Sequence, residues 1–228
     1  MHSRTLVAPL LTAILYVCCG TLSAASSADT FSFSAQTAKD AEKNHTDAAN
    51  QAAAIQALVS VPCRQRLKDR KILLLIGERH ADQWLTSQDR YGKFIAVIES
   101  RLRALGLKPY TQQQITASIA QAEIDAYFKN DPDAALSASK RLGASYILRG
   151  SISTQAGVNP VVNVNEVAVD IDLTLSGVSG SVLSEVSAHA DSYSGSDTPA
   201  MALTLVREKA DPLVAQLYND YCRADASR

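Results

Sequence analysis

The chain has 228 residues and an almost balanced charge, with 22 Lys and Arg residues against 23 Asp and Glu residues. This length predicts one domain with a short appendage, and the balanced charge argues against a protein that binds nucleic acid or an anionic membrane surface. Aromatic residues make up only 6% of the sequence. The core is therefore expected to be aliphatic.

The first 28 residues have the pattern of an export signal. Arg4 supplies a positive charge, residues 6–19 are apolar apart from one Thr, and small residues at 23–28 allow cleavage after Ala25 or Ala28. The apolar run is shorter than the about 20 residues of a membrane-spanning helix. We therefore predict a cleaved signal peptide and a periplasmic protein, with an uncleaved anchor as the alternative.

Cys18 and Cys19 raise a second alternative, which is a lipid-attached protein. Val17 stands directly before them, where a small residue is typical of a lipid-attachment site. A cleaved signal is therefore preferred over a lipoprotein.

The remaining cysteines, Cys63 and Cys222, are expected to form a disulfide, because two cysteines in an exported chain usually pair. The bridge would join the two ends of the main domain. Two free thiols are the alternative. The sequence has no Cys-x-x-Cys pattern, which argues against a redox motif or a structural zinc site.

The mature chain divides into three predicted segments. Residues 29–62 form an appendage that is rich in Ala and Gln, with an extended or disordered start at Asp29–Gln36 and a weakly amphipathic helix at Ala38–Val59. Residues 63–222 form a single α/β domain. Residues 223–228 are expected to be a flexible tail.

The first half of this domain is predicted to alternate a strand with helices. The apolar run Lys71–Gly77 predicts a strand buried on both faces, and residues 78–92 are predicted to be a polar loop. A helix follows at Lys93–Leu105, with Gly106 in the left-handed position that ends it, and a short strand at Leu107–Tyr110.

Two further helices carry clear start signals. Thr111 and Gln114 have the spacing of a capping box. Asp131 and Pro132 predict the cap and first residue of the next helix. Gly143 is expected to end that helix.

The second half of the domain is predicted to contain long strands and a final helix. Ala144–Ser153 predicts a strand, and Thr154–Pro160 a loop. From Val167 the alternation predicts a strand with one packed face and one wet face. A return strand at 181–193 would complete a hairpin and pack Val182, Val186, Ala188 and Ala190. A helix after Thr198 contains Pro212, which predicts either a kink or a restart.

The order of these elements resembles a group of bacterial periplasmic domains. The resemblance rests on the strand at 71–77, the helix that ends Leu105-Gly106-Leu107, and the stretch Leu-Gly-Ala-Ser-Tyr-Ile-Leu-Arg-Gly-Ser-Ile at 142–152. The group includes the amino-terminal domain of TolB, the curli secretion lipoprotein, the lipoprotein activator of penicillin-binding proteins, and the flagellar assembly protein T. Ser145 stands where Asp is common.

The resemblance implies an α+β fold with an α/β-like start, of the anticodon-binding-domain-like type. Such a fold has a small mixed sheet with a long antiparallel hairpin, packed by helices. It also implies a non-enzymatic role in envelope assembly through protein contacts. It assigns no functional residue, because the shared pattern is a packing pattern.

Besides the face of the sheet, the preferred interaction surface is the loop after the first strand. Glu78, Arg79, His80 and Trp84 lie there, beyond the carboxyl end of a strand, where ligands gather in open α/β sheets. These residues are predicted to contact a protein partner. A small polar ligand site that uses Glu78 and His80 is the alternative.

The wet face of the predicted hairpin offers a second grouping, since Asp170, Asp172, Glu185, His189 and Asp191 share that face. Carboxylates and an imidazole can bind a metal ion when three or four of them converge. A solvated polar face is the preferred interpretation, so no metal or other cofactor is predicted.

No pattern in the sequence indicates catalysis. There is no Gly-x-Ser-x-Gly, no phosphate-binding Gly-rich loop and no His-Glu-x-x-His. We therefore predict a non-enzymatic protein-binding domain of a flagellar, secretion or cell-wall complex. A periplasmic small-ligand or metal-binding protein is the main alternative, and a hydrolase of unrecognised type is a remote one.

Overall fold

The computed structural model describes residues 33–60, 63–80, 83–129 and 131–226, and the chain divides into two units, residues 1–43 and 44–228. Helix α1 runs from Phe33 to Val59. It begins earlier than predicted, because the first part of this stretch contains neither Gly nor Pro to interrupt it. The predicted signal peptide, with Cys18 and Cys19, lies outside the described residues.

The second unit is built on a mixed sheet with the strand order β2-β1-β4-β5-β6, in which β3 also pairs with β1. Strands β1 and β4 are parallel, as are β1 and β3, and the other pairs are antiparallel. The strands are β1 Lys71–His80, β2 Gln83–Leu85, β3 Lys108–Pro109, β4 Tyr146–Val158, β5 Asn165–Gly177 and β6 Val182–Ser194.

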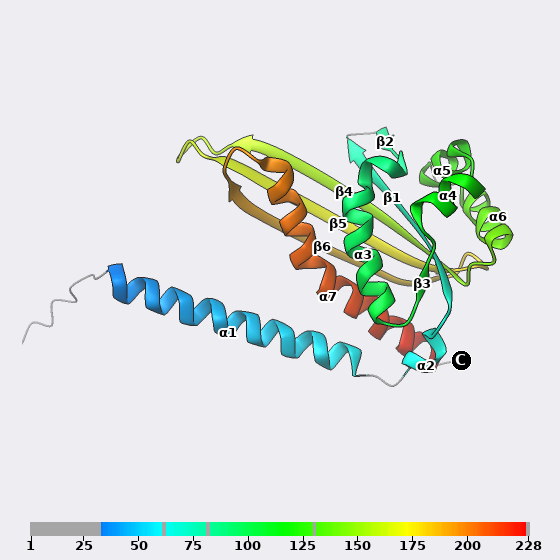
Figure 1. The fold of residues 1–228 in the computed structure, drawn as a ribbon, viewed down its shortest axis with the longest axis horizontal. Coiled ribbons are helices and arrows are strands. Elements are labelled where there is room, and N and C mark those ends of the chain that lie inside the picture. Colours follow the sequence, from blue (N-terminus) through cyan, green and yellow to red (C-terminus); the bar gives the residue numbers. More distant parts are fainter. Residues whose placement is uncertain (1–32, 61–62, 81–82, 130, 227–228) are drawn as a thin grey trace, which may run out of the picture. The chain divides into compact units, whose positions relative to one another are not determined.

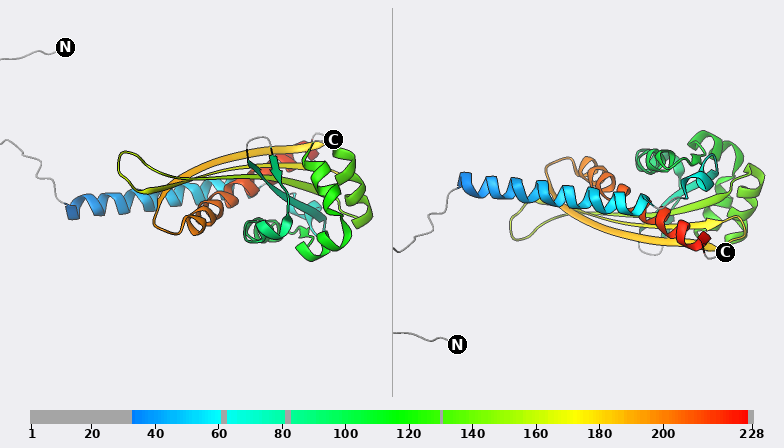
Figure 2. Two further views of the ribbon diagram at one scale, coloured as in Figure 1. Left: turned by 90° about the horizontal axis from the view of Figure 1, so that it is seen from above. Right: turned by 90° about the horizontal axis from the view of Figure 1, so that it is seen from below.

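Helices pack on both faces of this sheet. Helices α3 and α7 cover one face along its length, whereas α4, α5 and α6 gather at one end (Figure 1, Figure 2). This arrangement confirms the predicted α+β class with its long antiparallel hairpin. The helices are α2 Arg64–Leu67, η1 Gln88–Tyr91, α3 Gly92–Ala104, α4 Gln112–Ser118, α5 Gln121–Phe128, α6 Pro132–Leu142 and α7 Thr198–Ala226.

The larger core lies between the sheet and α3 with α7. Alternate residues of β5 point into it, as the pattern predicted, because successive side chains of a strand face opposite sides. A gap between the sheet, α3 and α7 in this core measures only about 20 Å³, which is too little for more than about one water molecule. The β5 residues in it are Val167, Val169, Ile171, Leu173 and Leu175.

A smaller core lies on the other face, under α4–α6. Leu73 and Leu75 of β1 and Ile147 of β4 pack there against Phe128. Gly77 makes this possible, since a Cβ at that position would lie only 2.7 Å from a carbon of the Phe128 ring. Strand β1 is therefore buried on both faces from Ile72 to Gly77, as predicted.

The predicted helix termini are confirmed. The Thr111 hydroxyl accepts a hydrogen bond from the backbone of Gln114, whose side chain accepts one from the backbone of Thr111. The Asp131 side chain caps α6. Gly106 and Gly143 have positive φ values of 97° and 67°, the conformation that glycine adopts most readily.

The predicted loop at 78–92 is wrong. Strand β1 continues to His80 and turns into β2, so that Glu78 pairs with Leu85 and Arg79 with Trp84; η1 then leads into α3. The polar composition of this stretch suggested a loop, but backbone pairing extends the sheet instead. The turn between these strands, residues 81–82, lies outside the described residues.

Two predictions for the long hairpins also need correction. Strand β4 continues through Thr154 to Val158, because it pairs with β5 over its whole length. The return strand does not pack Val182, which is 55% exposed. A register shift places Ser184 opposite Leu175 and Val182 opposite Ser176, so that Val182 moves to the other face.

Helix α7 is continuous through Pro212, so it does not restart there. It continues to Ala226, and residues 223–226 are therefore helical rather than part of a tail. Cys222 near its end forms the predicted disulfide with Cys63, with Cα atoms 5.8 Å apart. Both half-cystines are buried.

No helix in the described part of the chain is both long and apolar enough to span a membrane.

Candidate functional site

One face of the sheet, opposite α3 and α7, carries exposed or half-buried polar side chains from five strands. Cross-strand partners lie on the same face of a sheet, and the pairs Arg79–Trp84, Ser151–Asp172 and Asp172–Ser187 link the strands. We call this surface the open face. It comprises Arg79, Trp84, Arg149, Ser151, Ser153, Gln155, Asp170, Asp172, Thr174, Glu185, Ser187, His189 and Asp191.

The open face joins the two groups of candidate residues that the sequence suggested separately. Arg79 and Trp84 come from the predicted interaction loop, and the Asp, Glu and His residues come from the predicted hairpin. The residues between them, including Ser151 and Ser153, are supplied by β4. Strand pairing thus makes one surface from segments that are far apart in the sequence.

An aromatic cluster holds the Arg149 side chain at one end of the open face. The guanidinium carbon lies 5.4 Å from the ring centres of Trp84 and Tyr127 and 5.2 Å from that of Phe128. Arg149 also donates a hydrogen bond to the Phe128 carbonyl. Contacts of this kind stabilise a cation over aromatic faces, so Trp84 and Arg149 have fixed positions before any partner arrives.

Charge is divided across the open face. Arg79 and Arg149 lie on the strands nearest α4–α6, and carboxylates dominate the strands on the other side. Partial burial, followed by the neighbouring Asp170 charge, raises the pKa of Asp172, while Arg79 acts in the opposite direction. A binding partner would have to match a basic and an acidic sector.

The His189 imidazole does not complete a metal site. Its Nδ1 lies 2.6 Å from an Asp170 oxygen, and its Nε2 lies 3.6 Å from an Asp191 oxygen. Within the described residues, no group of three or more His, Cys, Asp or Glu side chains could hold a metal ion. The imidazole is therefore hydrogen-bonded to Asp170 and lies near the Asp191 carboxylate.

Glu78 does not belong to the open face, although it precedes Arg79. Its side chain points to the opposite side of the sheet and is only 6% exposed. The carboxylate accepts hydrogen bonds from Tyr91 (3.1 Å) and Thr154 (2.8 Å). It lines a surface hollow of about 250 Å³ together with Phe94 and Thr198.

The four residues of the predicted interaction loop are thus separated by the structure. Arg79 is exposed and Trp84 is half-buried on the open face. Glu78 lies on the other side of the sheet. The backbone of His80 ends β1, and its side chain lies outside the described residues.

Beside Trp84 the surface is hollowed to about 360 Å³, with Gln121 and Asp125 of α5 on the far wall. Hydrogen bonds from the Thr86 hydroxyl and then from Gln121 lower the pKa of Asp125. Asp125 is therefore a fixed anion at the edge of the cluster. Lys129 lines the same hollow, so this edge of the open face presents a carboxylate and an ammonium group beside Trp84.

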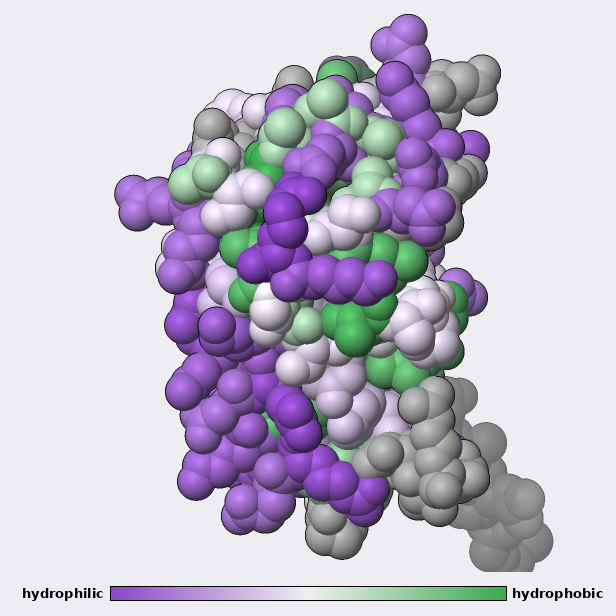
Figure 3. Space-filling model, turned by 90° about the vertical axis from the view of Figure 1, so that its right-hand side faces the viewer, coloured by the Kyte–Doolittle hydropathy of each residue, from purple (hydrophilic) through white to green (hydrophobic). Residues whose placement is uncertain are grey.

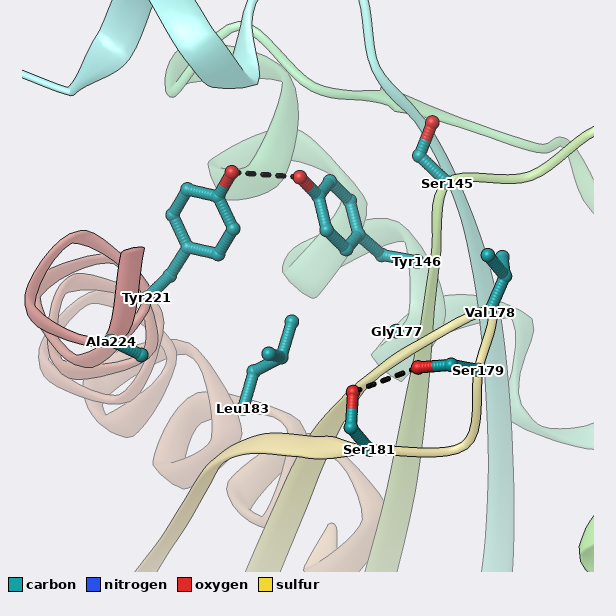
Figure 4. Close-up of a pocket in the computed structure, with 9 residues that line it drawn as sticks. All are labelled: Ser145, Tyr146, Gly177, Val178, Ser179, Ser181, Leu183, Tyr221 and Ala224. Atoms are coloured by element: carbon teal, nitrogen blue, oxygen red, sulfur yellow. Dashed lines mark hydrogen bonds between the residues drawn. The ribbon is translucent and has the colours of Figure 1, made fainter. Parts of the chain in front are cut away.

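A third hollow, of about 250 Å³, lies at the turn between β5 and β6 (Figure 4). Tyr146 and Tyr221 point toward one another across its rim, with hydroxyl oxygens 2.8 Å apart. The Ser179 and Ser181 hydroxyls also pair, at 3.0 Å. The hydroxyl groups of each pair are hydrogen-bonded to one another. None of the residues that line this hollow is an acid or base that could activate a hydroxyl as a nucleophile.

Seen from the end that carries α4–α6, hydrophilic residues dominate one flank, and smaller hydrophobic areas lie between them (Figure 3). This end of the molecule combines charge with limited apolar surface.

Arg149 is the residue of this site that the sequence did not single out. The sequence does contain a sign of its importance, because Arg149 is a charged residue within the apolar strand Tyr-Ile-Leu-Arg-Gly at 146–150. Its role could not be predicted, because Trp84 and Phe128, which surround it, come from a strand and a helix that are distant in the sequence.

No protein-family model matches the chain, and no match was found among curated proteins. Solved structures similar to it include the PelC dodecamer from Paraburkholderia phytofirmans (18% identity, 67% of this chain and 90% of that chain, TM-score 0.40). A minor lipoprotein from Acinetobacter baumannii is also similar (9% identity, 65% of this chain and 92% of that chain, TM-score 0.39). So is the LpoB C-terminal domain from Salmonella enterica (17% identity, 60% of this chain and 96% of that chain, TM-score 0.35).

LpoB, an activator of penicillin-binding proteins, belongs to the group that residues 142–152 resemble. Identities below 25% with TM-scores below 0.5 assign neither a family nor a function to this chain. Cys18 and Cys19 lie outside the described residues, so the preference for a cleaved signal over a lipid-attached chain stays a prediction.

Proposed function

We propose that this chain is a non-enzymatic, periplasmic domain that binds another cell-envelope protein through the open face. The observation that carries the proposal is the open face itself, on which polar side chains from five strands extend from a fixed aromatic and guanidinium cluster at one end. The export pattern of residues 1–28 supports the periplasmic location.

The Trp84–Arg149 cluster supports protein binding. Trp, Tyr and Arg are enriched among the residues that contribute most to interface affinity. Their side chains here are held by mutual contacts and by the Phe128 carbonyl, so little conformational entropy would be lost when a partner binds.

The charge distribution supports a specific partner rather than a general one. A basic sector around Arg79 and Arg149 lies beside an acidic sector that includes Asp172 and Glu185. Complementary charge mainly raises the association rate and excludes wrong partners. The expected partner presents an acidic patch next to a basic one.

The arrangement of the His189–Asp170 pair supports a non-enzymatic role. Both side chains are about half exposed, with 58% and 47% of their surfaces accessible. A general base usually lies in a partly desolvated cleft, whereas these two side chains lie on an exposed strand surface.

A matched pair of variants tests the proposal. Glu185→Arg reverses a charge on the open face, and Glu208→Arg reverses an exposed charge on α7. Tagged wild-type and variant proteins would be isolated from the envelope of cells that make them, and the bound proteins identified by mass spectrometry. We expect a partner that is retained by wild type and Glu208→Arg and lost from Glu185→Arg and Trp84→Ala.

The partner would then be purified and titrated against the same variants. A set of bound proteins that does not change with the open face would contradict the proposal. So would heat from a divalent-metal titration that disappears in Asp170→Ala.

A further inference from the structure

The hairpin between β4 and β5 ends in an exposed apolar tip. Six large hydrophobic side chains in the described residues are exposed, and four of them are valines at the end of this hairpin. The fifth, Tyr193, lies on β6 opposite Glu166. We call this segment, residues 158–164 with Val158, Val161, Val162 and Val164, the valine tip.

The valine tip extends the hairpin past the first turn of α7 (Figure 1, Figure 2). Val161 is 88% exposed and Val162 is 53% exposed. Exposed apolar groups that gather at one place usually mark a contact site, whereas single ones need no explanation. We therefore expect a partner to bury the valine side chains of the tip.

The tip has a defined shape. The Asn159 side-chain oxygen accepts hydrogen bonds from the backbone of Val161 (3.0 Å) and Val162 (3.3 Å). The Asn159 amide donates to the Glu166 carboxylate, and Asn163 adopts a positive φ of 52°. Pro160 further limits the backbone. A preformed turn with stiff, β-branched side chains loses little entropy when it binds.

The charge around the tip indicates what kind of partner fits it. From Gly150 to Val206 the sequence contains no Lys or Arg, and Glu166, Asp170 and Asp191 lie on the parts of β5 and β6 nearest the tip. An anionic membrane surface attracts basic segments and would repel this one. A protein groove with an apolar floor and a rim of Lys or Arg would complement both the valines and the carboxylates.

We propose that the valine tip is a second docking element, which inserts into an apolar groove bordered by basic residues on a partner protein. The proposal goes beyond the open face, since the tip could bind whether or not the open face does. Together the two elements would let the domain contact partners along its length.

The test uses the full chain in cells that make it. The photo-crosslinking amino acid p-benzoylphenylalanine is placed at position 161 or, as a control, at position 182, because Val182 is an equally apolar side chain with 55% exposure at another place on the sheet. We expect a discrete protein adduct from position 161 and none of the same mass from position 182.

Charge reversal tests the nature of the groove. Asp191→Lys, near the tip on β6, is expected to lower the yield of the adduct about threefold, since reversing an exposed charge changes an ion-pair contribution by this order. Glu185→Lys, on the open face but farther from the tip, and Glu208→Lys on α7 are both expected to leave the adduct yield unchanged. An unchanged yield with Asp191→Lys would contradict the basic rim.

A vesicle measurement separates a protein partner from a membrane. Purified wild type and the double variant Val161→Ser with Val162→Ser are mixed with phosphatidylcholine vesicles, with and without phosphatidylglycerol. We expect neither protein to sediment with them, and equal melting temperatures, since the tip lies outside the core. Sedimentation that depends on the valines, or an adduct that is a second copy of this chain, would overturn the proposal.

Discussion

The guanidinium carbon of Arg149 lies 5.4 Å from the centre of the Trp84 ring, and this contact joins the central strand β4 to the edge strand β2. Trp84 is the only Trp in the chain. Its fluorescence therefore reports on the surroundings of this one ring, which also packs against Phe128.

Arg149→Met is expected to expose Trp84 and to lower the free energy of unfolding by about 1–2 kcal/mol, because partly buried cation–aromatic contacts contribute at this level. The Trp84 emission should shift to longer wavelength, and iodide should quench it more strongly. Arg207→Met, an exposed position on α7, is the control. Identical emission and quenching in both variants would show that Arg149 does not hold the ring.

Gly77→Ala is expected to destabilise the domain by about 1–3 kcal/mol, since a Cβ there would lie 2.7 Å from the Phe128 ring, and overpacked cores cost this much. Gly157→Ala in β4 is the matched control, because nothing lies within 4 Å of a Cβ at that position. Urea unfolding of both variants checks this. Equal midpoints would mean that Phe128 can move aside without cost.

Loss of the Cys63–Cys222 disulfide is expected to lower the free energy of unfolding by about 4–5 kcal/mol in the chain-entropy model, because the bridge spans 159 positions of sequence. The double variant Cys63→Ala with Cys222→Ala would be compared with wild type in urea. A reductant should destabilise wild type and leave the double variant unchanged. A loss below about 1 kcal/mol would argue against a structural role for the bridge.

Asp172→Asn is expected to stabilise the fold at neutral pH. The pKa of Asp172 is raised above its usual 3.8 in the folded state, mainly by burial, so its ionisation opposes folding. The penalty is absent below pH 3.8, develops as the pH rises through the folded-state pKa, and is complete above it. The melting temperatures of wild type and variant should therefore converge as the pH falls.

Asp125→Asn should behave in the opposite way. Hydrogen bonds from Thr86 and Gln121 lower the pKa of Asp125, so its ionised form stabilises the fold, and this contribution is lost as the pH falls through the folded-state pKa. The variant should be less stable than wild type at neutral pH. Melting temperatures that shift in the same direction for both variants would contradict these assignments.

Local signals made much of the fold predictable. The alternation of Val167, Val169 and Ile171 predicted a one-sided strand, and the cap at Thr111 and the stop at Gly143 predicted helix ends. Each of these depends on residues a few positions apart. The chemistry that determines them is therefore contained in a short segment.

Features that depend on pairing between distant segments were not predictable. Glu78 follows an apolar strand and looks like the start of a loop, but pairing with Leu85 keeps it in β1. Val182 fits the alternation of its strand, yet a register shift moves it to the other face. The open face was not predictable as a single site for the same reason, because four strand pairings bring its residues together.

Carboxylate footprinting in intact cells tests the central claim, which is that the open face is covered by a protein partner. Glycine ethyl ester and a carbodiimide would label the exposed carboxylates of the protein in cells and after purification. The account predicts that Glu185 and Asp191 are labelled more slowly in cells than in the purified protein, while Glu208 on α7 is labelled equally in both. Equal labelling of all three residues in both settings would contradict it.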